Sequence, residues 1–161
     1  MNVIIDINDI TKRNIQYYDA TTNTVLDDST FIRIGYSNKW FTTNGLFIYT
    51  SFHITKVDKY FNKIKYIYDY HNNRTLIETL ITLEKNILDN INIPGIVKTY
   101  RLKEQLQTGT ISVFDLDDEG DIFHTNRLHR LTLKLSGVWI TQNNLGLTYK
   151  FLKSIYPSVE K

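Results

Sequence analysis

The 161-residue chain contains no cysteine. Disulfide bonds, Cys-ligated zinc and thiolate catalysis are therefore excluded, and the lack of disulfides is typical of a reducing compartment. No stretch comes near the ~20 consecutive apolar residues that a membrane span requires. The first residues, MNVIIDINDITKRN, also lack the basic lead and long apolar core of a secretory signal. We therefore expect a cytoplasmic protein without a membrane partner.

Glycine and proline are scarce as well, with seven and two residues respectively. The glycines are scattered, and none of them belongs to a phosphate-binding loop. No serine lies in a nucleophile elbow. His124 and His129 are five residues apart on a loop-to-strand segment, whose geometry does not bring them together as metal ligands. These absences favour a protein that is not an enzyme and that uses no cofactor.

The excess of positive charge is small, because 19 Lys and Arg against 17 Asp and Glu give a net charge of +2. A strong non-specific DNA-binding protein often carries more, since neutralisation of phosphates supplies most of such affinity. Any basic surface of this chain must therefore be local.

Aromatic residues, by contrast, make up 13% of the chain, and eleven of them are tyrosines. Together with 42% hydrophobic residues, this composition argues against disorder and indicates a chain that buries a sizeable core. Tyrosine combines an apolar ring with a hydrogen-bonding tip, so it suits strands and hydrated binding faces. We expect one domain over residues 1–161, in which residues 1–29 extend a core of residues 30–156.

The clearest pattern is the stretch 131–152, LTLKLSGVWITQNNLGLTYKFL. Its apolar residues alternate with polar ones, which is the period-two pattern of half-buried strands. Turn-forming residues at 142–146 separate the two runs. We therefore predict a β-hairpin with one apolar face and with Lys134 and Lys150 on the other face.

Similar patterns predict further strands at 30–36, 46–57, 62–70, 96–102, 109–116 and 127–135. One convincing helix is expected among them at about 75–91, where leucine and isoleucine recur at three- and four-residue steps. Thr75 and Glu78 fit a capping box at its start. Three strands, one helix and then further strands is the element order of an OB-fold. We therefore predict a mostly β protein, an OB-fold-like Greek-key β-barrel with one main α-helix.

An acidic segment, DLDDEGD, occupies residues 115–121. It places acidic residues at positions one, three and five of an EF-hand-like loop, but position twelve is Asn126, where a bidentate glutamate is needed. We interpret the segment as a solvated acidic loop. A metal-dependent nuclease is the alternative, with ligands or a base drawn from Asp117, Glu119, Asp121 and His124.

Lysine and arginine are interleaved with aromatic residues in the stretches 39–41, 56–70, 127–134 and 139–150. Proteins that bind single strands need cations that track the phosphates and aromatic faces on which the bases stack. With Tyr49, these stretches supply the candidate nucleic-acid-binding residues Lys39, Trp40, Phe41, Tyr49, Lys56, Lys65, Tyr66, Arg130, Lys134, Trp139 and Lys150. Trp40 is the strongest candidate because it lies in a polar loop, whereas Tyr66 is more typical of a core and Trp139 fits either role.

The end of the hairpin, GVWITQNNLGLTYKF at 137–151 with LTLKLS before it, resembles the C-terminal strand pair of a group of small proteins. These proteins are encoded by large cytoplasmic DNA viruses and yeast cytoplasmic linear plasmids. The matching residues are Gly137, Val138, Trp139, Gly146, Leu147, Tyr149, Lys150 and Phe151. Some members of the group are single-stranded DNA-binding proteins of the OB-fold type, so the resemblance implies the same fold and function. It assigns none of these residues a contact with DNA.

We therefore expect a single-stranded DNA-binding protein that acts in DNA replication or repair, through stacking and phosphate contacts without sequence specificity. Single-stranded DNA or RNA is the expected partner, and replication proteins or a second copy of the chain are further candidates. The alternatives are a structural or protein-interaction subunit of a viral or replicative assembly, and the metal-dependent nuclease described above.

Overall fold

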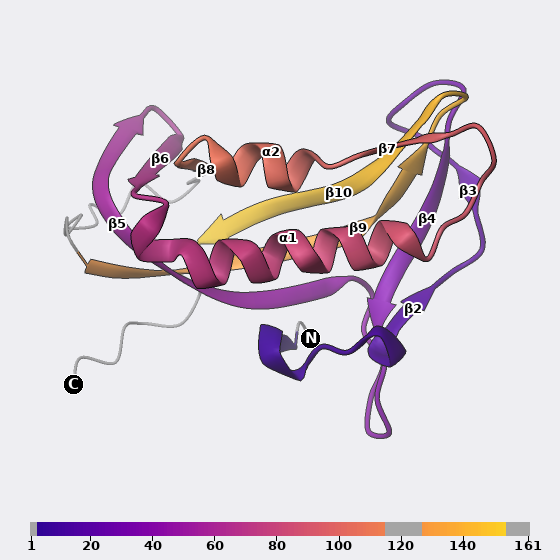
Figure 1. Ribbon diagram of the computed structural model, residues 1–161, viewed down its shortest axis with the longest axis horizontal. Helices are drawn as coiled ribbons and strands as arrows, with labels where there is room; N and C mark the ends of the chain where they lie inside the picture. Colours follow the sequence, from indigo (N-terminus) through magenta and orange to yellow (C-terminus); the bar gives the residue numbers. More distant parts are fainter. Residues whose placement is uncertain (1–2, 115–126, 154–161) are drawn as a thin grey trace.

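A computed structural model describes residues 3–114 and 127–153 of the chain (Figure 1). Within these ranges the strands are β1 (Ile4–Asp6), β2 (Ile15–Tyr17), β3 (Thr21–Thr22), β4 (Thr30–Tyr36), β5 (Leu46–Tyr60), β6 (Lys63–Tyr68), β7 (Val97–Thr99), β8 (Thr110–Phe114), β9 (Arg127–Ile140) and β10 (Asn144–Lys153). The α-helices are α1 (Arg74–Asp89) and α2 (Arg101–Gln107), and the 3-10 turns are η1 (Ile7–Asp9), η2 (Lys12–Asn14) and η3 (His71–Asn73). The prediction of a mostly β protein with one main helix is confirmed.

Strand β9 lies at the centre of the sheet, whose order is β2-β4-β9-β5-β6-β8. β10 pairs with β9 in antiparallel fashion from Leu145 to Lys153, so the predicted hairpin at 131–152 is confirmed. On its other edge, β9 pairs with β5 up to Leu135 and with β4 from Gly137 onward. The two early strands β5 and β4 therefore follow one another along one edge of β9, and β10 covers the other edge.

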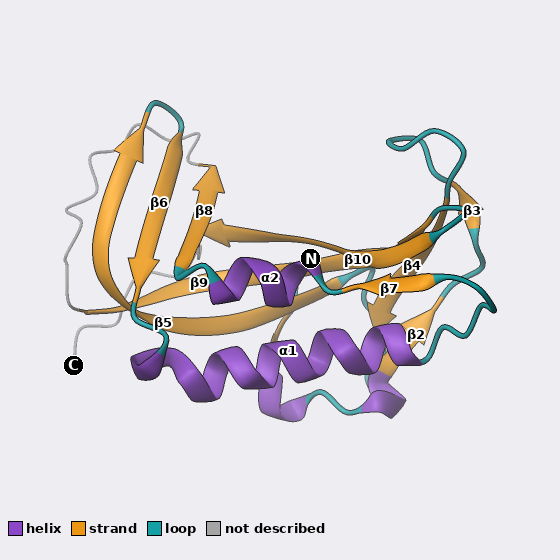
Figure 2. Cartoon of the chain, turned by 45° about the horizontal axis from the view of Figure 1, so that its top comes forward, coloured by secondary structure: helices purple, strands orange, loops and turns teal. Residues whose placement is uncertain are grey.

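Strand β5 carries the sheet around a bend. It pairs with β9 up to Ile54 and with β6 from Ile54 to Tyr60, and the register shifts between Ile54 and Lys56. β6 in turn pairs with β8, and Figure 2 shows β6 and β8 standing steeply against the long β9–β10 ribbon. β8 also contacts β10, although no hydrogen-bonded ladder joins these two strands within the described residues. The strands β8-β6-β5-β9-β10 thus curve into an open, barrel-like sheet.

The N-terminal segment adds strands to this sheet. β1 pairs parallel with β5, and β2 and β3 pair antiparallel with β4. The Tyr17 hydroxyl donates to the carbonyl of Ile87 at 3.0 Å and accepts from the Asn90 side chain at 3.2 Å, which ties β2 to the end of α1. Burial raises the pKa of Tyr17, so this hydroxyl stays a donor.

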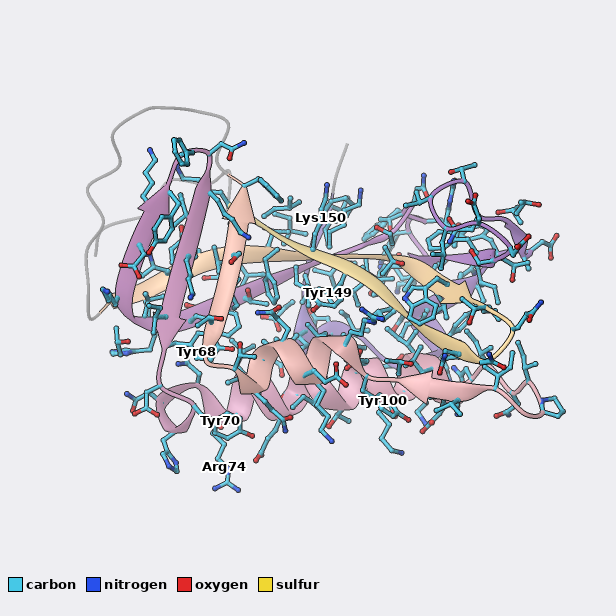
Figure 3. All side chains as sticks on the ribbon, turned by 90° about the horizontal axis from the view of Figure 1, so that it is seen from above. Tyr68, Tyr70, Arg74, Tyr100, Tyr149 and Lys150 are labelled. Carbon is cyan, nitrogen blue, oxygen red and sulfur yellow. The ribbon has the colours of Figure 1, made fainter. Side chains whose placement is uncertain are left out.

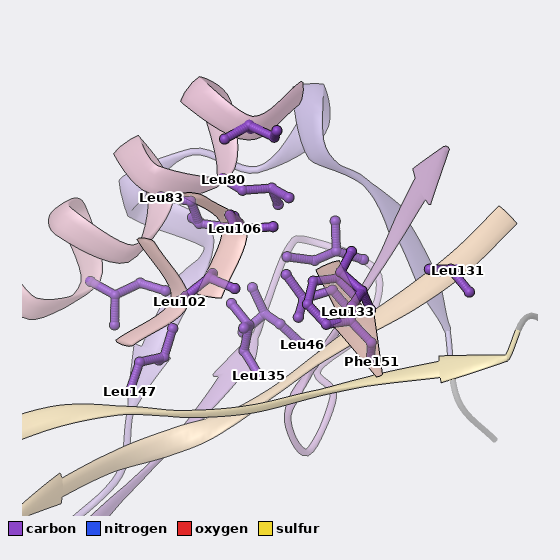
Figure 4. Packing of buried hydrophobic residues seen from close by; sticks show 14 of the residues in the cluster. Leu46, Leu80, Leu83, Leu102, Leu106, Leu131, Leu133, Leu135, Leu147 and Phe151 are labelled. Atoms are coloured by element: carbon purple, nitrogen blue, oxygen red, sulfur yellow. The ribbon is translucent and has the colours of Figure 1, made fainter. Parts of the chain in front are cut away.

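The core lies between the inner face of the sheet and the two helices (Figure 4). Leu46 and Ile48 on β5 are fully buried opposite Leu135 and Leu133 on β9. Leu80 and its neighbours on the apolar stripe of α1 close this layer from the other side. Burial of each such side chain contributes about 1.5–3 kcal/mol to the free energy of folding. The inner face of the sheet is therefore committed to the core, and the opposite face is the one left to solvent.

The capping-box prediction for the main helix is wrong. α1 begins at Arg74, so Thr75 lies inside the first turn, and Glu78 accepts a hydrogen bond from Arg74 Nε at 2.8 Å. Asn73 precedes the helix, and its side chain binds the backbone of His53, accepting from the amide at 2.7 Å and donating to the carbonyl at 3.0 Å. Asn73 thus ties the start of the helix to β5.

The predicted strand at 96–102 is wrong in its second half, where the chain forms the short helix α2 after β7. Leu102 and Leu106 are one helical turn apart and both are fully buried. The carboxylate of Glu84 on α1, itself buried, accepts from the amides of Leu102 at 2.9 Å and Lys103 at 2.8 Å. Burial raises the pKa of Glu84, and its two amide partners identify it as the cap of α2.

Candidate nucleic-acid interface

The outer face of the sheet, opposite the core, carries an aromatic and basic patch. Side chains alternate along β5, so Phe47 and Tyr49 point to the face opposite the buried core residues Leu46 and Ile48. In the strand registers Phe47 lies opposite Lys134 on β9, and Lys134 lies opposite Lys150 on β10. Arg130 is on the same face of β9, four residues before Lys134. We call Phe47, Tyr49, Arg130, Lys134 and Lys150 the outer patch.

Two of these cations lie over aromatic rings. Lys134 Nζ is 5.4 Å from the centroid of the Phe47 ring, and the Arg130 guanidinium carbon is 5.8 Å from the centroid of the Tyr49 ring. Both distances are within the range of cation–π attraction. Phe47 is 7% exposed, whereas Tyr49 is half-buried. Phe47 therefore supports the lysine, and Tyr49 is the aromatic ring of the patch that is more open to solvent.

Lys150 extends the patch onto β10. Figure 3 shows it on the side of β10 away from α2, whereas the hydroxyl of its neighbour Tyr149 donates to the Arg101 carbonyl at 3.2 Å. Like charges directly opposite each other on paired strands are unfavourable. Among the described residues, no carboxylate forms an ion pair with Lys134 or Lys150. A bound anion would relieve this repulsion.

Three adjoining hollows run along the outer face and form what we call the outer groove. The first has a volume of about 540 Å³ and is lined by Phe47, Lys134 and Lys150, with Asn44 at its rim. Asn44 also lines the second, of about 530 Å³, which reaches Arg33 on β4. Arg33 in turn lines the third, of about 740 Å³. Because neighbouring hollows share lining residues, the three lie next to one another in a row on residues of β10, β9, β5 and β4.

The charge along this path is mostly positive. The groove is lined by Arg33, Arg101, Lys134 and Lys150, and Asp19 is the one acidic residue among its described lining residues. None of the four cations forms an ion pair within residues 3–114 and 127–153. The groove therefore supplies the local basic surface that a chain of low net charge needs in order to bind a polyanion.

Trp139, undecided from the sequence, lies on the outer face and lines the third hollow. It is half-buried, because one side of its indole packs on Gly146 of β10. A Cβ at Gly146 would lie 2.5 Å from the Trp139 ring, so only glycine allows this approach. The Arg101 guanidinium carbon is 5.5 Å from the ring centroid. Trp139 is thus a fixed wall of the groove and is no part of the core.

Lys39, Trp40 and Phe41 lie in the loop between β4 and β5, which projects from the body of the protein (Figure 1). Trp40 is 78% exposed, and Lys39 Nζ is 4.7 Å from its ring centroid. The Asn38 side chain accepts from the amides of Trp40 at 2.8 Å and Phe41 at 3.0 Å, which orders the tip. The base of the loop, at Asn44, lines the groove, whereas Lys39, Trp40 and Phe41 line none of the three hollows.

Lys56 and Lys65 lie at the other end of the sheet, on the β5–β6 hairpin, and line none of the three hollows described above. Lys56 Nζ is 3.1 Å from an Asp58 carboxylate oxygen, and Asp58 is also the cross-strand neighbour of Lys65. An acidic residue thus accompanies both lysines. The structure separates these two candidates from the outer groove.

Tyr66 is not available for stacking, and its prediction as a binding residue is wrong. Its side chain is 4% exposed and faces the core from β6, with its ring centroid 5.5 Å from that of His129. In the register of β6, Tyr66 shares the face of the core residues Ile64 and Tyr68. A ring enclosed in this way stabilises the core and offers no free face to a base.

Sequence reasoning missed several residues that line the groove: Phe31, Arg33, Phe47 and Arg101. The sequence pattern could have identified Phe47, because it alternates in phase with the candidate Tyr49 and so lies on the same face of β5. Phe31 and Arg33 had the same signal along β4. Arg101 had none, since its place in the groove follows from helix α2, which the sequence pattern did not predict.

The acidic segment 115–121 and His124 lie outside the described residues, so the nuclease hypothesis stays a prediction. Within the described residues, no group of three or more His, Asp or Glu side chains is arranged to hold a metal ion. No helix in these ranges is long and apolar enough to cross a bilayer.

No family model, curated protein or solved structure matches the chain. The resemblance of residues 137–151 to viral and plasmid proteins therefore stays an expectation.

Proposed function

We propose that the protein binds single-stranded DNA in the outer groove, without sequence specificity. The observation that carries this proposal is the row of three adjoining hollows, which brings four cations without ion-pair partners among the described residues together with aromatic rings on one face of the sheet. A basic groove with aromatic walls is the arrangement that single strands require, because phosphates and bases alternate along them.

The phosphates are held by Lys134 and Lys150 in the groove and by Arg130, which lies beside the groove on the same face of β9. Arg130 and Lys134 are four residues apart on β9, which corresponds to about 13 Å along a strand. Lys150 widens the basic surface onto β10. Cations spread over this distance neutralise several successive phosphates, so affinity falls as the salt concentration rises.

The bases stack on exposed ring faces. Tyr49 and Trp139 are both half-buried side chains on the outer face, and both rings are held by neighbouring groups. Stacking on such a ring contributes about 1–3 kcal/mol per base and depends little on base identity. A protein whose affinity comes from phosphates and stacking has weak sequence preference.

The proposal is tested by fluorescence anisotropy of a labelled oligo(dT), titrated with the full chain at several salt concentrations. We expect saturable binding whose log affinity falls linearly with log salt, and similar affinity for other single-stranded sequences. Duplex DNA of the same sequence should bind more weakly. A flat anisotropy at low salt and micromolar protein would remove the proposed function.

A second candidate function, a protein-interaction subunit, rests on a different surface. The turn between β5 and β6 presents Tyr60 and Phe61, and β8 ends nearby with Phe114; Phe61 is 99% exposed. Exposed rings gathered at one place are typical of protein contacts. Size-exclusion chromatography of the wild type and of a Phe61→Ser variant tests this role. An oligomer that the substitution dissociates supports it, and a monomer at all concentrations and with DNA present argues against it.

A further inference from the structure

The third hollow of the outer groove is a pocket with walls from several elements. Its volume is about 740 Å³, within the range of sites for small ligands. It is lined by Phe31 and Arg33 of β4, Trp139 of β9 and Arg101 of α2, and the segment 21–26 supplies a further wall.

The 21–26 wall is held by its own hydrogen bonds. The Asn23 amide donates to the Ser29 carbonyl at 2.9 Å, and the Asn23 side chain accepts from the Val25 amide at 3.0 Å. Ser29 is buried, and its hydroxyl donates to the Leu26 carbonyl at 2.6 Å. These bonds close the segment into a turn, so the pocket is preformed.

The chemistry of the pocket fits an anion that carries an aromatic ring. Arg33 and Arg101 both line it, and no aspartate or glutamate does so among the residues that the structure describes. Phe31 and Trp139 are cross-strand neighbours in the β4–β9 pairing, and both side chains line the pocket. Threonine hydroxyls, among them that of Thr148, supply further hydrogen-bond partners.

We propose that this pocket binds one nucleotide unit, with the base against Phe31 and Trp139 and the phosphate held by Arg33 and Arg101. Guanidinium groups suit phosphate because their donors match its oxygens in pairs. The unit is either a nucleotide of a strand that lies in the groove or a free nucleoside monophosphate. The first reading rests on the proposed function; the second does not.

The test uses Trp139 fluorescence in a Trp40→Phe variant, in which Trp139 is the only tryptophan of the chain. The probes are thymidine 5′-monophosphate, thymidine without phosphate, and oligo(dT). We expect the monophosphate to quench Trp139 with a dissociation constant on the order of 1 mM, because one nucleotide makes few contacts. Thymidine should bind much more weakly, and oligo(dT) should displace the monophosphate.

Arg33→Gln and Arg101→Gln, made separately, should each weaken the monophosphate about tenfold or more, because each removes a charged hydrogen-bond donor. Both arginines are exposed, so neither change should prevent folding. Lys103→Gln is the matched control, because it removes an exposed cation from the same helix as Arg101, outside the pocket.

The outcomes separate the two proposals. Oligo(dT) binding that is unchanged in both arginine variants, together with no quenching by the monophosphate, would overturn the pocket and leave the proposed function standing. Quenching by the monophosphate without any binding of oligo(dT) would support the pocket as a site for a free nucleotide and overturn the proposed function. Silence with every probe would overturn both.

Discussion

Lys134 Nζ lies 5.4 Å from the centroid of the Phe47 ring, across the pairing of β5 and β9. The ring is almost buried, and the lysine lines the groove beside Lys150. The aromatic ring thus holds a cation at the surface where two positive charges meet. This relationship joins the fold to the proposed function, because the same strand alternation that buries Leu46 turns Phe47 toward the lysine.

Lys134→Gln and Lys150→Gln should each weaken the binding of oligo(dT) at low salt. Each lysine contacts phosphate in our proposal, so each substitution should reduce the slope of log affinity against log salt by about 0.7. Anisotropy titrations over a salt series measure this slope. Lys85→Gln on α1 is the control with the same change in charge. An equal loss of affinity in that variant would show that the effect comes from the net charge and not from the groove.

Tyr49→Leu should lower the affinity for single-stranded DNA by the equivalent of about 1–3 kcal/mol, because it removes a stacking face. Its effect on the salt slope should be small, since no phosphate contact is lost. Tyr70→Leu, a change of the same type just before η3, should leave the affinity unchanged. The idea fails if Tyr49→Leu binds as the wild type does.

Trp40→Ala should leave the free energy of unfolding within about 0.5 kcal/mol of the wild type, because the ring is 78% exposed. It should weaken the binding of long oligonucleotides, which reach the loop tip beyond Asn44, and leave short ones unaffected. Denaturant unfolding and anisotropy measure the two effects. Wild-type affinity for oligonucleotides of every length would remove Trp40 from the site.

Glu84→Gln should change how stability depends on pH. Burial raises the pKa of Glu84 in the folded chain above its ordinary value of 4.5, which applies to the unfolded chain. At a pH between the unfolded-state and the folded-state pKa, the folded chain therefore keeps a proton that the unfolded chain has lost. The wild type should therefore lose stability relative to Glu84→Gln as pH rises through this window. The substituted glutamine also offers one acceptor oxygen to two amides, a cost of about 1–3 kcal/mol at every pH. A stability difference that stays constant with pH would contradict the assignment.

The strands and the main helix could be predicted because their signals are local. The alternation of Leu131, Leu133 and Leu135 gives β9, and the leucine and isoleucine spacing gives α1. The outward positions of Lys134 and Lys150 follow from the same alternation. α2 could not be predicted, because a long-range cap, Glu84 on α1, stabilises its first turn.

The groove itself could not be predicted from the sequence, because it depends on which strands become neighbours. β5 and β4 pair one after the other with the same edge of β9, which brings Arg33 and Lys134 onto one face of the sheet. The same pairing separates Lys56 and Lys65 from them. Tyr66 failed for a related reason, since alternation places it on a face but does not say which face is enclosed.

The central claim, that single-stranded DNA lies in the outer groove, is tested most directly by amide chemical-shift mapping of the full chain with oligo(dT). We expect the shifts that change to cluster in β4, the first half of β5, β9 and β10, around Arg33, Tyr49, Lys134, Trp139 and Lys150, with the exposed side of α1 unchanged. Changes confined to α1 or to the β5–β6 turn, with the outer face unaffected, would contradict the account.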